Sequence, residues 1–245
     1  MKERELTDFC QRMQAAAKEN LDSIVLYGSA ARDDFSEQYS DLNLLCIVRN
    51  AGTKELERLA PVVEWWTKSL ACRPPLILTE PELSGSADVF AIETLDMKAE
   101  HRILAGRDVL AGIEVRMNLH RVQLEHELRT MMMRLRQHYV LFAGHDENLK
   151  TALAKSVSSV VVMLRHAVIA LGQAPPTGSK RNQVAQAARV LGVDAAAIDA
   201  ALDLREGRKL EGSIRELYDR YMQAIAAVVE RVDTAAPKQQ WQRAR

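Results

Sequence analysis

One stretch near the N-terminus constrains the fold more than any other, because two apolar segments flank a Gly-Ser turn and a polar spacer. The first segment, Ile24 to Tyr27, predicts a buried strand, and Gly28-Ser29 follows it directly. A second strand is predicted from Asp41 to Val48, polar at its start and continuously apolar at its end. The stretch therefore predicts a strand, a turn and a second strand of one sheet.

The turn between these strands has residues that suit a phosphate site. Gly28 permits a sharp backbone turn and the close approach of a ligand. Ser29 opens a short predicted helix that includes Arg32, and free N–H groups at a helix start can bind an anion. Asp41 and Asn43 lie two apart on a strand, so both side chains point to one face. Two carboxylates in that arrangement hold Mg²⁺ or Mn²⁺, although the second position here is an amide.

These residues resemble the signature of the nucleotidyltransferase superfamily, which includes DNA polymerase beta and kanamycin nucleotidyltransferase. That signature joins a hydrophobic strand, Gly-Ser, a short spacer and an acidic-apolar-acidic-apolar strand. Here Gly28-Ser29 and Asp41-Leu42-Asn43-Leu44 occupy those places, with the eleven residues Ala30 to Ser40 between them. Two positions depart from the signature: Asp33 replaces a common glycine, and Asn43 replaces the second metal-binding carboxylate.

The resemblance implies transfer of a nucleoside monophosphate, which we expect to be AMP, from a nucleoside triphosphate to a hydroxyl acceptor. Gly28, Ser29 and Arg32 would bind the triphosphate, and Asp41 with Asn43 would bind the metal. Since Asn43 carries no charge, a second interpretation is a catalytically inactive nucleotide-binding or regulatory module that acts through a protein partner. A third is a purely structural strand–turn–strand unit in which Asp41 caps or pairs locally.

Superfamily members supply a third carboxylate from a later strand, and Glu93 and Asp96 are the candidates here. Both interrupt the apolar run Val89 to Met97, which is predicted to be a strand. The third carboxylate would help to bind the metal and would accept the proton of the acceptor hydroxyl. Glu93 is the first candidate, because apolar neighbours flank it. The alternative is that Glu93 faces solvent on an edge strand and Asp96 caps the next helix.

The remainder of the N-terminal half predicts elements that pack beside these strands. Helices are expected over Glu3 to Asn20 and over Thr53 to Leu70, the second with Thr53 as its N-cap. Leu76 to Leu78 is predicted to be a short buried strand, and Thr79 to Leu83 a capped helical turn.

After Met117 the strand signals cease, and apolar residues recur every three or four positions. Helices are predicted over residues 118–142, 148–171, 179–191, 195–204 and 210–232. The second of these is apolar on most sides, so it is predicted to be the central helix of a bundle. We therefore expect an α+β nucleotidyltransferase-like domain with a small mixed sheet over residues 1–117, an all-α helical bundle over 118–233 and a flexible tail over 234–245.

This order of domains resembles that of bacterial aminoglycoside nucleotidyltransferases, which close substrate between their two domains. Lys180, at the start of a predicted helix, could reach a triphosphate and is a further candidate nucleotide-binding residue. The alternative is that Lys180 is an ordinary exposed basic residue without a role in binding. The spacing of Arg121 and His126 resembles that of HEPN ribonucleases, but a chance match on a solvated helix face is the preferred interpretation.

Composition narrows the class of protein. The longest apolar runs are shorter than a membrane span, and the N-terminus shows no secretory signal, so we expect a cytoplasmic protein without a membrane partner. Cys10, Cys46 and Cys72 show neither a disulfide pattern nor zinc spacing, and Cys46 is expected in the core.

The charge is unevenly distributed. Residues 1–117 hold 14 Lys and Arg against 20 Asp and Glu, whereas residues 118–245 hold 19 against 13. A basic half could neutralise a triphosphate bound at an acidic half, or the two halves could simply dock. No dense basic run or aromatic platform marks a nucleic-acid surface, so we expect no nucleic-acid partner, while a protein partner or a homodimer stays open.

Overall fold

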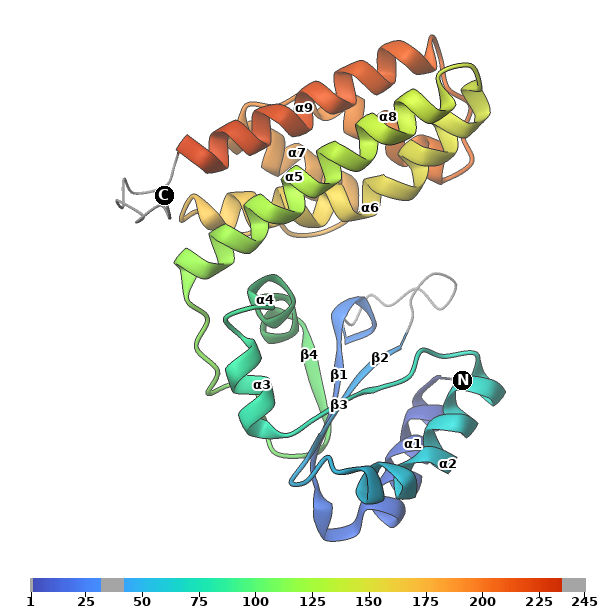
Figure 1. Cartoon of the computed structure of the whole chain (residues 1–245), viewed down its shortest axis with the longest axis vertical. Coiled ribbons are helices and arrows are strands. Elements are labelled where there is room, and N and C mark those ends of the chain that lie inside the picture. Colours follow the sequence, from blue (N-terminus) through green and yellow to red (C-terminus); the bar gives the residue numbers. More distant parts are fainter. Residues whose placement is uncertain (1, 32–41, 235–245) are drawn as a thin grey trace, which may run out of the picture. The chain divides into compact units, whose positions relative to one another are not determined.

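The computed structural model describes residues 2–31 and 42–234 (Figure 1). The chain divides into two compact units, Met1–Leu119 and His120–Arg245. The first unit holds a sheet with helices, and the second is built from helices in its described part. Each unit is described by itself below.

The sheet of the first unit has four described strands in the order β3-β2-β1-β4. They are β1 (Leu21–Tyr27), β2 (Asn43–Val48), β3 (Leu76–Leu78) and β4 (His101–Gly106). The central strand β1 pairs antiparallel with both β2 and β4, and β2 pairs parallel with β3, so the sheet is mixed, as predicted (Figure 1).

The central strands read as continuous apolar runs because both of their faces are covered. Ile24 and Leu26 of β1 face a core that includes Cys46, whereas Val25 faces a second core on the opposite side of the sheet. Cys46 is completely buried, which confirms its expected place in the core.

Helices α1 (Lys2–Ala17) and α2 (Thr53–Leu70) cover the first of these faces. The expected N-cap of α2 is wrong by one residue, because Gly52 occupies that position and Thr53 is already helical. The Asn50 side chain accepts the Gly52 N–H at 2.8 Å and so closes the turn before the helix. The helix continues through Pro61 to its predicted end.

The second face is covered by α3 (Glu80–Ser86), α4 (Ala91–Ala99) and the segment that follows β4. The predicted helical turn after Thr79 is confirmed. The Thr79 hydroxyl accepts the Glu82 N–H, and the Glu82 carboxylate accepts the Thr79 N–H at 2.7 Å, which forms a capping box.

The second unit contains five described helices, which match the five predicted segments closely. They are α5 (Met117–Phe142), α6 (Asp146–Ala170), α7 (Lys180–Leu191), α8 (Ala195–Arg205) and α9 (Ile214–Thr234). Helix α6 is central, as predicted, because it contacts α7, α8 and α9. Thr234 ends α9, and the rest of the predicted tail lies outside the described residues.

Helix α6 is also long and apolar enough to cross a membrane by length and composition alone. A core helix of a soluble protein passes the same test, and 56% of the most apolar window of α6 is buried inside the unit. The hydropathy of α6 is thus accounted for by its central place among α7, α8 and α9.

Asp194 joins the start of α8 to α9. Its carboxylate accepts the Ala196 N–H at 2.9 Å and forms an ion pair with Arg220 at 2.6 Å. Partial burial opposes ionisation, but the hydrogen bonds from Arg220 and from the first amides of α8 outweigh it and lower the pKa of Asp194. The ionised form of Asp194 is therefore the one that stabilises the fold.

Replacing Asp194 by alanine is expected to lower the free energy of unfolding by about 1 kcal/mol at neutral pH. Because the folded-state pKa lies below the unfolded-state value, this contribution is present above the unfolded-state pKa and is lost as the pH falls through the folded-state pKa. Denaturant titrations of the wild type and the variant at neutral pH and well below pH 3.8 would measure it. The control is D219A, which removes an exposed carboxylate of α9 bonded only within its own helix among described residues. A loss of equal size at both pH values would contradict the assignment.

Candidate functional site

The predicted phosphate turn lies where β1 ends. Gly28 has a φ of +78° and begins a short 3₁₀ helix, Gly28–Ala31. A Cβ at Gly28 would lie 3.5 Å from Nδ2 of Asn43. Residue 28 therefore needs glycine for its left-handed backbone, and its Cα lies directly beside the start of β2.

The strand register gathers polar side chains at this same edge of the sheet. Tyr27 pairs with Asn43 on β2 and with His101 on β4. Tyr27 belongs to the second core described above, and burial raises its pKa while the charge of Arg73 opposes the rise. Tyr27 therefore stays neutral at physiological pH, and its hydroxyl can donate a hydrogen bond.

The N–H of Gly28 is already used within the fold. It donates to the carbonyl of Glu100 at 2.9 Å, which ties the turn to the short connection between α4 and β4. Backbone donors for a phosphate would therefore come from Ser29 onward, and the contribution of Gly28 is its conformation.

Several predicted site residues are not placed by the structure. Arg32 and Asp41 lie outside the described residues, and only the backbone of Ser29 is described, as part of the 3₁₀ helix. Their roles in nucleotide and metal binding stay predictions. Asn43 is the one member of the predicted metal pair that the structure places, half-buried at the first position of β2.

The predicted strand around Glu93 and Asp96 is wrong, because this segment is helix α4. Ala91, Thr94 and Met97 are buried at intervals of three residues, which is a helical spacing, and Met97 packs in the core on the second face of the sheet. Glu93 is exposed, whereas Asp96 is half-buried in the last turn of α4, close in sequence to Glu100. We call the edge of the sheet where Tyr27, Gly28, Asn43 and His101 meet the Gly28 corner. Of the two candidates, Asp96 lies on the turn of helix nearer to this corner, because Glu100, which accepts the Gly28 N–H, directly follows α4.

The described strands supply few side chains that could bind a metal ion. Within the four described strands the only carboxylate is Asp22, at the opposite end of β1 from Gly28, and it is bonded to Arg49 at 3.0 Å. No group of three or more His, Cys, Asp or Glu side chains that could hold a metal ion occurs among residues 2–31 and 42–234.

His101 is a residue at the corner that the sequence did not single out. Its Nε2 lies 3.4 Å from Oδ2 of Asp108, whose other oxygen accepts the N–H groups of Leu110 and Ala111. Loss of some solvation opposes ionisation of the exposed Asp108, but these hydrogen bonds outweigh it and lower its pKa. His101 is the first residue of β4. The sequence of β4 is short and mixed, so it did not predict a strand, and His101 could not be placed at this edge of the sheet.

Lys180 lies in the second unit. It is the first residue of α7, which Ser179 caps, and its ammonium group donates to the Ser158 hydroxyl at 3.1 Å. Partial burial and the nearby charge of Arg205 lower the pKa of Lys180, while Glu206 opposes this effect. Its contact with a nucleotide stays a prediction.

Comparison with known proteins bears on the fold. No protein-family model matches the chain, and no curated protein does. Among solved structures, a spectinomycin adenyltransferase, AAD(9), from Enterococcus faecialis, solved with ATP and spectinomycin, is similar with a TM-score of 0.53. The two chains are 12% identical, and the match covers 94% of this chain and 99% of the other.

The chain shares its fold with this adenyltransferase. The predicted fold class, a small mixed sheet with helices followed by helices alone, is thereby confirmed. At this low identity the likeness concerns the fold, so the activity has to be argued from the residues of this chain.

Proposed function

We propose that this protein binds a nucleoside triphosphate at the Gly28 corner and transfers its nucleoside monophosphate, AMP in the first instance, to a hydroxyl acceptor. The observation that supports the proposal is the left-handed turn at Gly28 beside Asn43, in a fold similar to that of an adenyltransferase solved with ATP. The acceptor class follows from the same neighbour, whose structure contains spectinomycin.

A single divalent cation fits the donor set better than two. Asp41 and Asn43 offer one carboxylate and one amide oxygen, and Mg²⁺ is commonly held by one or two carboxylates together with substrate phosphates. Mg²⁺ or Mn²⁺ bound there would offset part of the negative charge of the triphosphate. The missing charge at position 43 predicts weaker binding of the metal than a pair of carboxylates would give.

The residues of the chain would do the remaining work by position and charge. Ser29 and the amides after it would hold the phosphates, with Arg32 as a cationic partner. The acceptor oxygen would attack the α-phosphorus as its proton passes to a carboxylate, for which Asp96 is now preferred over Glu93. The new oxygen–phosphorus bond would form as the bond to the leaving pyrophosphate breaks.

A second function, a non-catalytic nucleotide-binding or regulatory module that acts through a protein partner, is favoured by a different observation. Asn43 replaces a carboxylate, the described strands carry none at this edge, and Glu93 is exposed on a helix. This function shares the binding step with the first and lacks the transfer step.

Calorimetric titration with a non-hydrolysable ATP analogue, with and without Mg²⁺, tests the shared step. We expect binding that requires Mg²⁺ and is lost in D41A, since that variant removes the one carboxylate of the predicted pair. D8A, which removes an exposed carboxylate of α1, is the matched control and should bind as the wild type does. Failure of the ATP, GTP, CTP and UTP analogues to bind under either condition would refute the proposal.

Release of pyrophosphate from ATP in the presence of hydroxyl acceptors separates the two functions. Aminoglycosides and spectinomycin are the first acceptors to try, because of the structural neighbour. Acceptor-dependent release supports transfer. Metal-dependent binding without release across a broad acceptor panel supports the regulatory module.

A further inference from the structure

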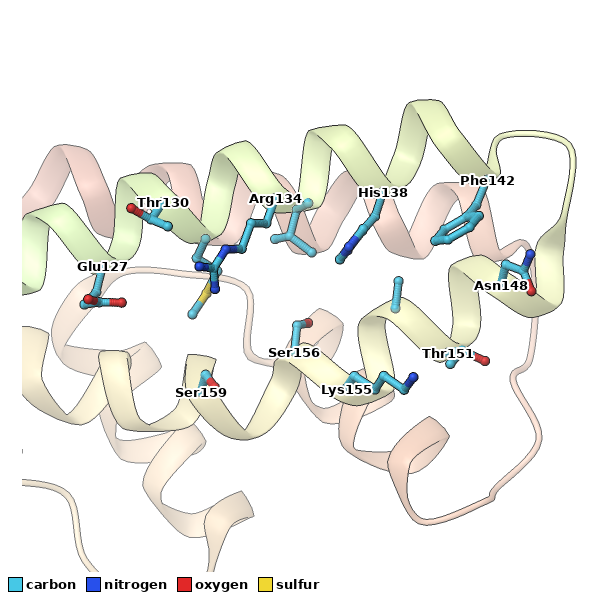
Figure 2. A pocket seen from close by; sticks show the side chains of 13 residues that line it. Glu127, Thr130, Arg134, His138, Phe142, Asn148, Thr151, Lys155, Ser156 and Ser159 are labelled. Carbon is cyan, nitrogen blue, oxygen red and sulfur yellow. The ribbon is translucent and has the colours of Figure 1, made fainter. Parts of the chain in front are cut away.

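A groove of about 580 Å³ lies between α5 and α6 in the helical unit (Figure 2). Its volume falls within the range of small-molecule sites, roughly 300–1,000 Å³. Residues of α5 from Glu127 to Phe142 form one wall, and residues of α6 from Asn148 to Ser159 form the other. Apart from Lys155, the α6 wall carries short side chains, and three of them, Thr151, Ser156 and Ser159, have hydroxyl groups.

The groove carries more cations than anions. Arg134 of α5 and Lys155 of α6 line it, against one carboxylate, Glu127. Neither cation forms an ion pair with any residue in the described part of the chain. By contrast, Arg129 on the same helix is paired with Glu125 at 2.7 Å. Two cations without counter-ions on facing walls favour an anionic ligand.

The type of cation and its polar neighbours favour a phosphate. An arginine guanidinium can donate two parallel hydrogen bonds to a phosphate, and a lysine adds a compact charge. Thr130, Thr151 and Ser159 add hydroxyl groups to the lining. A phosphomonoester carries a charge of about −1.5 to −2 at neutral pH, which matches two cations better than a single carboxylate does.

One end of the groove is aromatic. The rings of His138 and Phe142 lie 5.9 Å apart with an interplanar angle of 26°, so they are stacked. Figure 2 shows both side chains directed from α5 toward the groove, and Arg134 one turn earlier on the same helix. Stacked rings beside an apolar wall that includes Leu135 offer a surface for another flat ring.

We propose that the α5–α6 groove binds an aryl phosphomonoester. The phosphate binds at the Arg134 end of the groove, and the flat ring packs against His138 and Phe142, at the end where Lys155 lies (Figure 2). This site belongs to the helical unit alone and shares no residue with the nucleotide site proposed at Gly28, so it gives the protein a second ligand.

Calorimetric titration of the full chain with phenyl phosphate, in the presence of a metal chelator, tests the proposal. We expect saturable binding that is weakened about tenfold or more in R134Q, since it removes charge-assisted hydrogen bonds, and weakened less in K155Q, which removes a charge at the other end of the groove. R136Q, an exposed arginine of α5 outside the groove lining, is the matched control and should retain wild-type affinity. D41A should also retain it, which separates this site from the proposed nucleotide site.

Two related probes test the two halves of the ligand. Benzoate keeps the ring but replaces the phosphate, and inorganic phosphate lacks the ring, so both should bind more weakly than phenyl phosphate. Equal affinity for benzoate would overturn the phosphate assignment, and equal affinity for inorganic phosphate would overturn the aromatic one. Absence of saturable phenyl phosphate binding, or the same loss in R136Q as in R134Q, would overturn the site itself.

Discussion

Replacing Asn43 by aspartate is expected to raise the affinity of the protein for Mg²⁺ in the presence of a nucleoside triphosphate by about tenfold or more, since ligand charge strongly tunes the affinity of oxygen sites for divalent cations. The position is suitable because Asn43 opens β2 beside the Gly28 turn. Aspartate has nearly the same shape as asparagine, so the strand pairing of Tyr27 with residue 43 should be kept. The added carboxylate changes the charge of the site and little else.

The same variant should raise acceptor-dependent pyrophosphate release if the protein is a transferase with a weakened metal site. Titration of Mg²⁺ at fixed nucleotide analogue measures the first effect, and a coupled pyrophosphate assay measures the second. N118D adds the same charge at an exposed position of α5 and is the control, expected to leave both quantities unchanged. Unchanged metal affinity in N43D would show that position 43 is not a metal position, and higher affinity without release would favour the regulatory module.

Replacing Trp66 by alanine is expected to lower the free energy of unfolding of the first unit by about 3–5 kcal/mol. Trp66 is fully buried in the core between α1, α2 and the sheet, with its ring centroid 4.8 Å from that of Phe9. Its indole N–H donates to the carbonyl of Arg73 at 3.0 Å, which secures the chain just before β3. The substitution removes a large apolar surface, opens a cavity and removes the donor that bonds to the Arg73 carbonyl.

The neighbouring Trp65 offers a matched control, because it is the same residue on the same helix. Trp65 is only half-buried, and the guanidinium of Arg12 lies 4.2 Å from its ring centroid. W65A should therefore cost about 1 kcal/mol, of the order of a surface cation–π contact and partial burial. Denaturant titrations followed by circular dichroism would compare the two variants. Losses of equal size would show that the core around Trp66 is not the main support of this unit.

The turn at Gly28 and the strands beside it could be predicted from the sequence because their defining features are local. A continuous apolar run that ends in Gly-Ser, followed by a second apolar run, predicts two buried strands and a turn without knowledge of the remainder of the chain. The structure has both strands, and Gly28 occupies the left-handed conformation that the turn requires. The metal roles of Asp41 and Asn43 remain predictions.

The helical unit was predictable for a similar reason. Its helices are long enough for a repeat of three or four residues to show over several turns, and the apolar character of α6 indicated its central place. In the structure, Ser179 and Asp194 cap the starts of α7 and α8. Long periodic segments carry enough local information to determine their own secondary structure.

The secondary structure of the segment from Val89 to Met97 could not be predicted from its local sequence. A short apolar run fits a buried strand or a short helix equally, and tertiary packing selects the helix, which buries Ala91, Thr94 and Met97. The mixed sequence of β4 becomes a strand because β1 provides a free edge for it. Tertiary pairing therefore placed His101 and the Glu100 carbonyl at the corner.

The sequence alone thus determined the strands β1 and β2, the Gly28 turn and the long helices, because each follows from residues that are neighbours in the chain. Only the tertiary structure decided the helical state of Glu93 and Asp96, the hydrogen bond from Gly28 to Glu100, and the groove that faces Arg134 toward α6. These features depend on contacts between segments far apart in the chain, and their free energy appears only once the segments have been brought together.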